Sequence, residues 1–238
     1  MSEHTDGREP RLRPGGAPVG RAAFLGTVAV GLSSLVWGKA AWDRVSGVVS
    51  PVAGTLLPVL PTSGWRIYSI ADTMPRFDPT TWRLRVDGLV AEPLELDYRK
   101  LRALPRVEQV STFHCVTGWT VQNVHWAGVR IADVIEPAEP RSGARALRFV
   151  SAEHPYDDYL TLEQTTLPDV MLAYEMDGKP LSRGHGAPLR LIIPDMYGYK
   201  NVKWLERIEL VRVDGSGYWE NLGYDRDAWV GHSNGYST

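Results

Sequence analysis

From Trp65 onward the chain alternates short strand patterns with short helix patterns, and this mixture limits the folds open to it. Strands are expected at residues 82–90, 107–113, 146–153, 171–181, 188–194 and 204–213, and short helices at 98–104, 129–135 and 160–167. Asp97 is placed to cap the first helix, and Asp177-Gly178 predicts a hairpin turn. Residues 188–194 are apolar enough for a strand buried on both faces. The sequence therefore predicts an α+β domain with mixed β-sheets.

The length, charge and cysteine content of the chain further narrow the class of protein and the kinds of partner it can have. Its 238 residues, 43% of them hydrophobic, suit a single globular domain with a buried core. A net charge of -2 gives no basic stripe, so a nucleic-acid partner is not expected. The single cysteine, Cys115, excludes an internal disulfide, and alone it cannot form a structural zinc site.

The N-terminal region has the pattern of a targeting or anchoring segment. Residues 1–21 are polar and rich in arginine, residues 22–42 contain a long uncharged run, and residues 43–64 are a Pro-, Gly- and Ser-rich linker before the domain at 65–238. The arginines favour a cytoplasmic N-terminus, an uncleaved membrane anchor and an extracytoplasmic domain. The alternative that residues 22–42 are a cleaved signal peptide stays open. So does a domain on the cytoplasmic face, because Arg21-Ala22-Ala23-Phe24-Leu25 resembles the twin-arginine export motif with Ala22 in place of its second arginine.

The segment around Cys115 is the second informative region. The run FHCVTGW places the thiol just past a strand end, where loops often carry function. A lone cysteine in this position is more often a small buried hydrophobe. However, a thiolate is a soft metal ligand, and a metal that receives its other sulfurs from an organic cofactor needs only one from the protein.

Two motifs carry a resemblance to a known family. The segment FHCVTGWTVQNVHWAGV, from Phe113, and the segment HGAPLRLIIPDMYGYKNVKWLERIEL, from His185, resemble the sulfite oxidase superfamily of molybdopterin-binding oxidoreductases. The resemblance is strongest to its small bacterial single-domain members, the group that includes the periplasmic methionine sulfoxide reductase catalytic subunit. It covers roughly Trp65 to the C-terminus and implies the sulfite oxidase-type fold with a molybdenum-molybdopterin (Mo-MPT) cofactor.

The resemblance also implies roles for individual residues. Cys115 would supply the protein's thiolate to molybdenum, and His185 and Arg190 would contact the pterin and its phosphate. The remaining cofactor contacts implied are Lys200, Asn201, Val202, Lys203, Tyr68 and Ser151. Fixed cations suit a terminal phosphate, since they form charge-assisted hydrogen bonds.

Other polar and aromatic side chains are expected to have lesser roles. Tyr159 and Tyr197 could each place a phenol near the metal, although such tyrosines more often lie at the edge of a core. The C-terminal aromatic residues are expected to pack over the domain. The acidic pair Asp157-Asp158, after His154, is interpreted as a solvated loop and not as a second metal site.

The implied reaction is oxygen-atom transfer on a small-molecule substrate. No C-x-x-C-H haem motif is present, so electrons are expected to pass through an external carrier, a cytochrome, near which a membrane anchor would hold the domain. The short C-terminal remainder favours a monomeric catalytic domain. The alternative is a membrane-anchored binding module without cofactor. The substrate stays open, since sulfite would call for converging arginines and only Arg66, Arg76 and Arg83 lie near the relevant segment.

Overall fold

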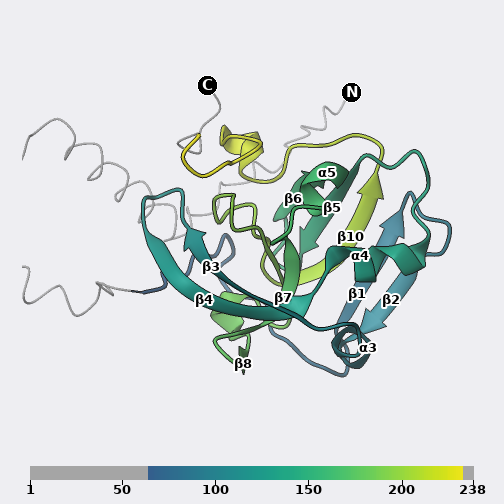
Figure 1. Cartoon of the computed structure of the whole chain (residues 1–238), viewed down its shortest axis with the longest axis horizontal. Coiled ribbons are helices and arrows are strands. Elements are labelled where there is room, and N and C mark those ends of the chain that lie inside the picture. Colours follow the sequence, from purple (N-terminus) through teal and green to yellow (C-terminus); the bar gives the residue numbers. More distant parts are fainter. Residues whose placement is uncertain (1–63, 233–238) are drawn as a thin grey trace, which may run out of the picture.

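The computed structural model describes residues 64–232, which form an α+β domain with two five-stranded sheets (Figure 1). The strands are β1 (Arg83–Gly88), β2 (Leu94–Asp97), β3 (Val107–His114), β4 (Thr120–Val129), β5 (Ala146–Ser151), β6 (Asp157–Thr161), β7 (Met171–Met176), β8 (Lys179–Pro180), β9 (Arg190–Ile192) and β10 (Leu205–Val211). The helices are α3 (Tyr98–Arg102), α4 (Ile131–Ile135) and α5 (Leu162–Thr165), with 3-10 turns η2 (Glu136–Ala138), η3 (Arg183–His185) and η4 (Glu220–Leu222). The predicted fold class is confirmed.

The two sheets differ in strand order and in the direction of their strand pairs. The first has the strand order β2-β1-β10-β5-β6, in which β1 runs parallel to β10 and the other pairs are antiparallel. The second has the order β3-β4-β7-β8, and β9 also pairs with β7. In Figure 1 the long, curved β3–β4 hairpin crosses the left and centre of the view, and the strands of the first sheet lie to its right.

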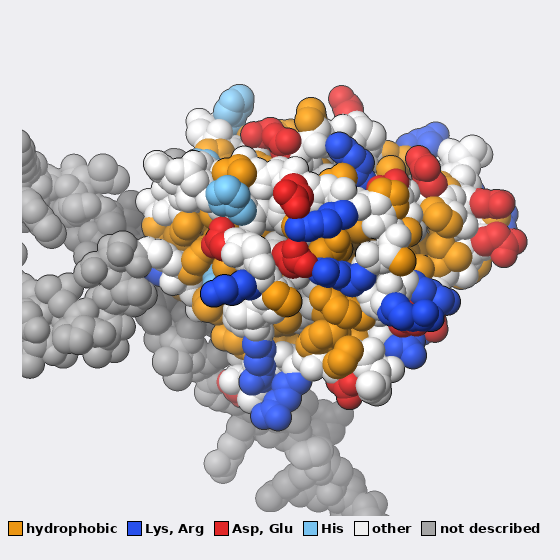
Figure 2. Space-filling view, turned by 60° about the horizontal axis from the view of Figure 1, so that its bottom comes forward, with side chains coloured by type: hydrophobic (Ala, Val, Ile, Leu, Met, Phe, Trp, Pro, Cys, Tyr) orange, Lys and Arg blue, Asp and Glu red, His pale blue; other side chains and the backbone are white. Residues whose placement is uncertain are grey.

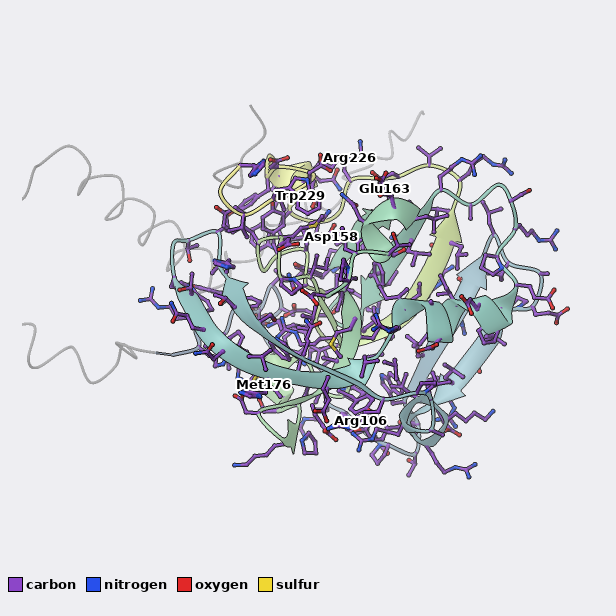
Figure 3. All side chains as sticks on the ribbon, in the orientation of Figure 1. Arg106, Asp158, Glu163, Met176, Arg226 and Trp229 are labelled. Carbon is purple, nitrogen blue, oxygen red and sulfur yellow. The ribbon has the colours of Figure 1, made fainter. Side chains whose placement is uncertain are left out.

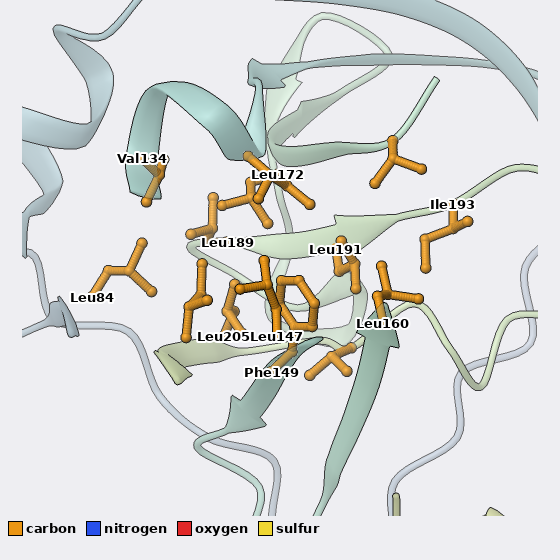
Figure 4. Close-up of a cluster of buried hydrophobic side chains, with 14 of the residues drawn as sticks. Leu84, Val134, Leu147, Phe149, Leu160, Leu172, Leu189, Leu191, Ile193 and Leu205 are labelled. Carbon is orange, nitrogen blue, oxygen red and sulfur yellow. The ribbon is translucent and has the colours of Figure 1, made fainter. Parts of the chain in front are cut away.

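The main core lies between the sheets and takes one face of each. Figure 4 shows Phe149 and Leu160 of the first sheet converging with Leu172 and Leu191 of the second. A smaller cluster, which includes Ile192, packs on the other face of the second sheet. Successive residues of β9 therefore enter different cores, and the prediction of a strand buried on both faces is confirmed.

Local sequence signals account for several element ends. The Asp97 Oδ1 atom accepts a hydrogen bond from the Lys100 N–H at 2.7 Å and so caps α3. Asp177 and Gly178 adopt positive φ values of 51° and 73°, as a tight hairpin turn between β7 and β8 requires. Gly128 lies at a register shift between β4 and β7, where a Cβ atom would stand 1.9 Å from the Leu172 carbonyl oxygen. Only glycine fits there.

Some elements differ from the sequence prediction. Strands β2, β4 and β6 were not expected, and the helices predicted at 129–135 and 160–167 begin two residues later. Residues 157 and 158, interpreted as a solvated loop, begin β6 instead, and Asp158 is buried because it pairs with a buried lysine.

Two features of residues 64–232 concern the membrane and the molecular surface. Within this part of the chain no helix is both long and apolar enough to cross a membrane. The predicted tail (1–21), signal or anchor (22–42) and linker (43–64) lie outside the described residues, apart from Gly64. On the face drawn in Figure 2, basic and acidic side chains are interspersed, as the near-neutral net charge leads one to expect.

Candidate cofactor and active site

A cavity of about 350 Å³ lies among the described residues. Its lining comes from five segments: residues 65–70, residues 113–119 at the β3–β4 turn, residues 151–156, residues 184–203, and residues 218–224. We call residues 65–71 the N-terminal strap, residues 197–203 the β9–β10 loop, and residues 217–225 the C-terminal segment. The cavity is therefore built from segments far apart in the sequence.

Cys115 lies in the tight turn that joins β3 to β4, and it faces the cavity. The Cys115 N–H donates to the Trp119 carbonyl at 2.9 Å, and the Gly118 N–H donates to the Cys115 carbonyl at 3.0 Å. The sulfur lies 3.2 Å from Thr117 Oγ1. Burial raises the pKa of the thiol, and the Thr117 contact and the charge of Arg66 oppose this only in part. The free thiol is therefore kept neutral, and a bound metal cation would reverse this.

Arg190, at the start of β9, presents a buried cation to the same cavity. The residue is 2% exposed, and its guanidinium lies 5.6 Å from the ring centroid of Phe113 and 5.3 Å from that of Trp126. One Nη1 atom donates to the His185 carbonyl at 3.2 Å, and Nε has no hydrogen-bond partner within the described structure. No carboxylate of the described residues pairs with this guanidinium, and burial lowers the pKa of Arg190 to about 10. Such a group is suited to an anionic ligand.

Lys203 and His185 flank Arg190. Burial, followed by the charge of Arg190, lowers the pKa of Lys203 to about 7 and that of His185 to about 4. The Lys203 ammonium donates to the Tyr68 carbonyl of the N-terminal strap at 2.5 Å. His185 packs edge-on against Trp65, with 4.8 Å between ring centroids. Near neutral pH the imidazole is therefore uncharged, and the Lys203 side chain is a mixture of amine and ammonium that a bound anion would shift toward the ammonium.

Asn201 and Ser151, two further predicted residues, line the cavity, and their side chains make hydrogen bonds to the backbone around it. Asn201 Oδ1 accepts a hydrogen bond from the Ile193 N–H at 2.8 Å, which closes the β9–β10 loop. Ser151 Oγ donates to the Lys203 carbonyl at 2.8 Å and accepts from the Glu153 N–H at 3.0 Å. The Glu153 carboxylate in turn accepts from the Ser69 hydroxyl and the Ile70 N–H of the strap. These residues position the strap and the loop.

Four predicted site residues lie outside the cavity lining. Lys200 points away from the cavity and pairs with two carboxylates. Val202 is 0% exposed and belongs to the main core. The Tyr159 ring packs against Gly215, and the Tyr197 hydroxyl accepts a 3.5 Å hydrogen bond from the Gly231 N–H. The side chains of Lys200, Tyr159 and Tyr197 make these contacts within the protein, and their contacts with cofactor or metal stay predictions.

Other lining residues had no clear signal in the sequence. The C-terminal aromatic residues Tyr218, Trp219 and Tyr224 were expected to pack, and they do pack on one another, but they also form a wall of the cavity. Tyr156 and Glu153 complete the opposite side. Of the three arginines considered for a substrate anion, only Arg66 lines the cavity.

The donor set of the cavity fits a molybdenum-pterin group. A buried guanidinium with a free Nε among the described residues and an ammonium suit its phosphate, neutral imidazole suits a pterin edge, and a free thiol suits the metal. A family model described as "Oxidoreductase molybdopterin binding domain" matches residues 71–219 of the chain, well over half of it. The chain belongs to this family. Membership of this family implies that its cofactor is molybdenum-molybdopterin.

Individual relatives agree with this family. The chain is 35% identical to the uncharacterized oxidoreductase YuiH of Bacillus subtilis over 199 residues, which are 82% of this chain and 96% of that protein. It is 32% identical to sulfite oxidase of Arabidopsis thaliana over 60% of this chain and 45% of the relative. It is 29% identical to the protein-methionine-sulfoxide reductase catalytic subunit MsrP of Gluconobacter oxydans, over 66% of this chain and 56% of the relative. The chain thus spans about half the length of these two relatives.

A solved structure supports the fold. The sulfane dehydrogenase SoxCD of Paracoccus pantotrophus aligns with a TM-score of 0.55 over 59% of this chain and 40% of that chain, at 23% identity. The family model and the relatives together show a molybdopterin-binding oxidoreductase that is similar to sulfite oxidase and to MsrP.

Proposed function

We propose that this molybdopterin oxidoreductase transfers an oxygen atom at a molybdenum centre to which Cys115 supplies the protein's thiolate. The observation that carries the proposal is the joint placement on one cavity of the free Cys115 thiol and the buried Arg190 guanidinium, whose Nε has no hydrogen-bond partner among the described residues. A thiol alone would be a buried hydrophobe, and a buried arginine alone would be a costly core residue. Because both line one cavity, the thiol would bind the metal and the guanidinium would bind the phosphate of one cofactor.

The roles of the surrounding residues follow from their positions. Arg190 and Lys203 would bind the terminal phosphate of the cofactor, with His185 at the pterin edge. Asn201 and Ser151 would act by holding the backbone that presents Lys203. The strap residue Tyr68, whose carbonyl already contacts the Lys203 ammonium, would close over the cofactor.

The bound group supplies oxygen-atom transfer coupled to a two-electron change at the metal. The protein supplies the cavity that would enclose this group. Trp119 and the aromatic side chains of the C-terminal segment line the cavity and would exclude water from it once the cofactor is bound. The charge of Arg66 acts on the Cys115 thiol. This charge would orient an oxygen of the substrate.

The aromatic wall favours an uncharged organic S-oxide or N-oxide as substrate. Sulfite would require several converging cations to hold its two charges, and among the arginines considered only Arg66 reaches the cavity. The relative named for methionine sulfoxide reduction is compatible with this choice. We therefore propose a sulfoxide before sulfite.

The electron carrier and location are also proposals. In the described residues no second redox motif accompanies the cavity, so an external carrier such as a cytochrome would exchange electrons with the domain. The relative MsrP is itself named a catalytic subunit, which supports a separate partner. We keep the proposal of an extracytoplasmic domain, anchored through residues 22–42 and monomeric in its catalytic part.

Cofactor loading and turnover test the proposal. Wild type, Cys115→Ala and the control Thr120→Ala, an exposed residue of the same hairpin outside the cavity, would be produced in a host that makes the cofactor. Molybdenum and released pterin near one per chain are expected in wild type and control, together with reduction of methyl p-tolyl sulfoxide by a reduced viologen dye. Cys115→Ala should lose turnover. A Cys115→Ala protein that keeps both molybdenum and turnover contradicts the proposal, and absence of both metal and pterin from folded wild type favours the cofactor-free binding module.

A further inference from the structure

A buried ion cluster lies behind the cavity and takes no part in its lining. The Lys200 ammonium lies 2.5 Å from Asp158 Oδ1 and 3.0 Å from Glu220 Oε1, and the three side chains are only 2–3% exposed. Figure 3 shows Asp158 in the interior, beneath the stretch that carries Arg226 and Trp229. Lys200 therefore joins two carboxylates that lie far apart in the sequence.

Each member of the cluster belongs to a segment that also contributes to the cavity. Asp158 follows Tyr156, Lys200 precedes Asn201 in the β9–β10 loop, and Glu220 follows Trp219 in the C-terminal segment. The cluster thus connects the loop that presents the cofactor-binding residues with the segment that forms the aromatic wall. A shift of the ammonium would move both sides of the cavity relative to each other.

The C-terminal segment has further contacts with the same region. The Tyr218 N–H donates to the Asp157 carbonyl at 3.0 Å, and the Tyr199 hydroxyl donates to the Asp225 carbonyl at 2.6 Å. Gly217 approaches β6 so closely that a Cβ atom would lie 2.6 Å from the Asp157 carbonyl oxygen. These contacts bind the two ends of the segment, and the ion pair with Glu220 fixes its middle.

The electrostatics of the cluster make it sensitive to the loss of any member. Asp158 Oδ2 and Glu220 Oε2 have no hydrogen-bond partner among the described groups. Burial, reinforced by Glu220, raises the pKa of Asp158 although the Lys200 ammonium opposes this. Breaking a buried ion pair by removing one partner is strongly destabilising locally, whereas such pairs add little net stability over apolar packing. The cluster is therefore better explained by the geometry that it imposes than by the stability that it adds.

We propose that the Asp158–Lys200–Glu220 cluster is a positioning device that fixes the aromatic wall of residues 217–225 against the cofactor-binding loop and so sets how the substrate fits. Lys200 and Glu220 are then positioning residues that determine substrate specificity without touching the cofactor. This inference rests on the proposed function for its kinetic consequence, but its structural consequence is independent of activity.

Hydrogen exchange of the full chain tests the structural consequence. Glu220→Ala leaves Asp158 and Lys200 as a one-to-one pair, so the domain should fold. Amide exchange in residues 217–225 should become about tenfold faster or more, with exchange in β3 and β4 unchanged. Glu220→Gln keeps an oxygen acceptor for the ammonium and should restore slow exchange. The control Arg226→Ala removes an exposed ion pair with Asp214, adjoining the same segment, and should change exchange in 217–225 little.

Kinetics of the loaded enzyme test the consequence for specificity. Glu220→Ala should raise KM for methyl p-tolyl sulfoxide about tenfold, with kcat within about threefold and molybdenum content as in wild type, and Glu220→Gln should restore KM. Unchanged exchange in 217–225, a uniform rise across the whole domain, or an unchanged KM in Glu220→Ala would overturn the proposal. If wild type contains no molybdenum, the proposed function fails, and the exchange experiment still decides whether the cluster holds the wall.

Discussion

Arg190→Met is expected to make the metal-free domain more stable while abolishing its hold on the cofactor. The guanidinium is buried without a carboxylate partner among residues 64–232, and burial lowers the pKa of Arg190 to about 10. Each pKa unit corresponds to about 1.4 kcal/mol, so the charged form is disfavoured in the folded state by about 3 kcal/mol. Methionine has similar length and no charge to desolvate.

Two contacts would be lost and reduce this gain. The hydrogen bond to the His185 carbonyl contributes about 1 kcal/mol, and the contacts with the rings of Phe113 and Trp126 contribute about 1 kcal/mol together. The expected net gain in the free energy of unfolding is about 1 kcal/mol, or about 2–4 °C in Tm for a domain of this size. The loaded enzyme should respond in the opposite direction, since the phosphate of the cofactor would lose its buried partner.

Thermal unfolding of wild type and Arg190→Met measures the first effect when both are made in a host that cannot synthesise the cofactor. Molybdenum and pterin analysis after production in a competent host measures the second. The matched control Arg207→Met removes a partly exposed arginine that is paired with Asp87, and it should not raise Tm. A fall of more than about 2 kcal/mol in the metal-free Arg190→Met domain would refute the reasoning, because it would mean that the guanidinium is well paired without any ligand.

Three further predictions concern residues that line the cavity. Sulfate binding to the metal-free protein should weaken up to tenfold per pH unit above about pH 7, because the lowered pKa of Lys203 leaves a neutral amine there that must take up a proton to bind an anion. Calorimetry with sodium sulfate checks this, and pH-independent affinity would contradict it. The raised pKa of the Cys115 thiol should make iodoacetamide alkylation of the metal-free protein at pH 8 slower than that of a free cysteine, as mass spectrometry can show; a faster reaction would be the adverse result. Asn201→Ala should lower the free energy of unfolding by about 1–3 kcal/mol in urea titrations, since the buried Ile193 N–H loses its acceptor, whereas an unchanged value would mean that the N–H finds another partner.

The elements that the sequence predicted are those with strong local signals. Alternation placed β1, the capping aspartate placed α3, and Asp177-Gly178 placed the β7–β8 turn. Strand β4 was not expected because its register is set by pairing with β3 and β7 and by the close approach at Gly128. Such long-range pairing leaves little trace in a short window of sequence.

The candidate site divides in the same way. Cys115, His185, Arg190 and Lys203 were predicted from a motif resemblance, and the structure brings these four onto one cavity. Lys200 lies in the same motif, yet its direction depends on Asp158 and Glu220, which come from other segments. A motif gives the residue type at a position, but the partners that turn its side chain toward or away from the cavity are tertiary.

The most direct test of the central claim is molybdenum K-edge X-ray absorption on the loaded wild type and Cys115→Ser. The account predicts that the wild-type metal has one more sulfur neighbour than the metal in the serine variant. An equal number of sulfur neighbours in the two loaded proteins would contradict ligation by Cys115.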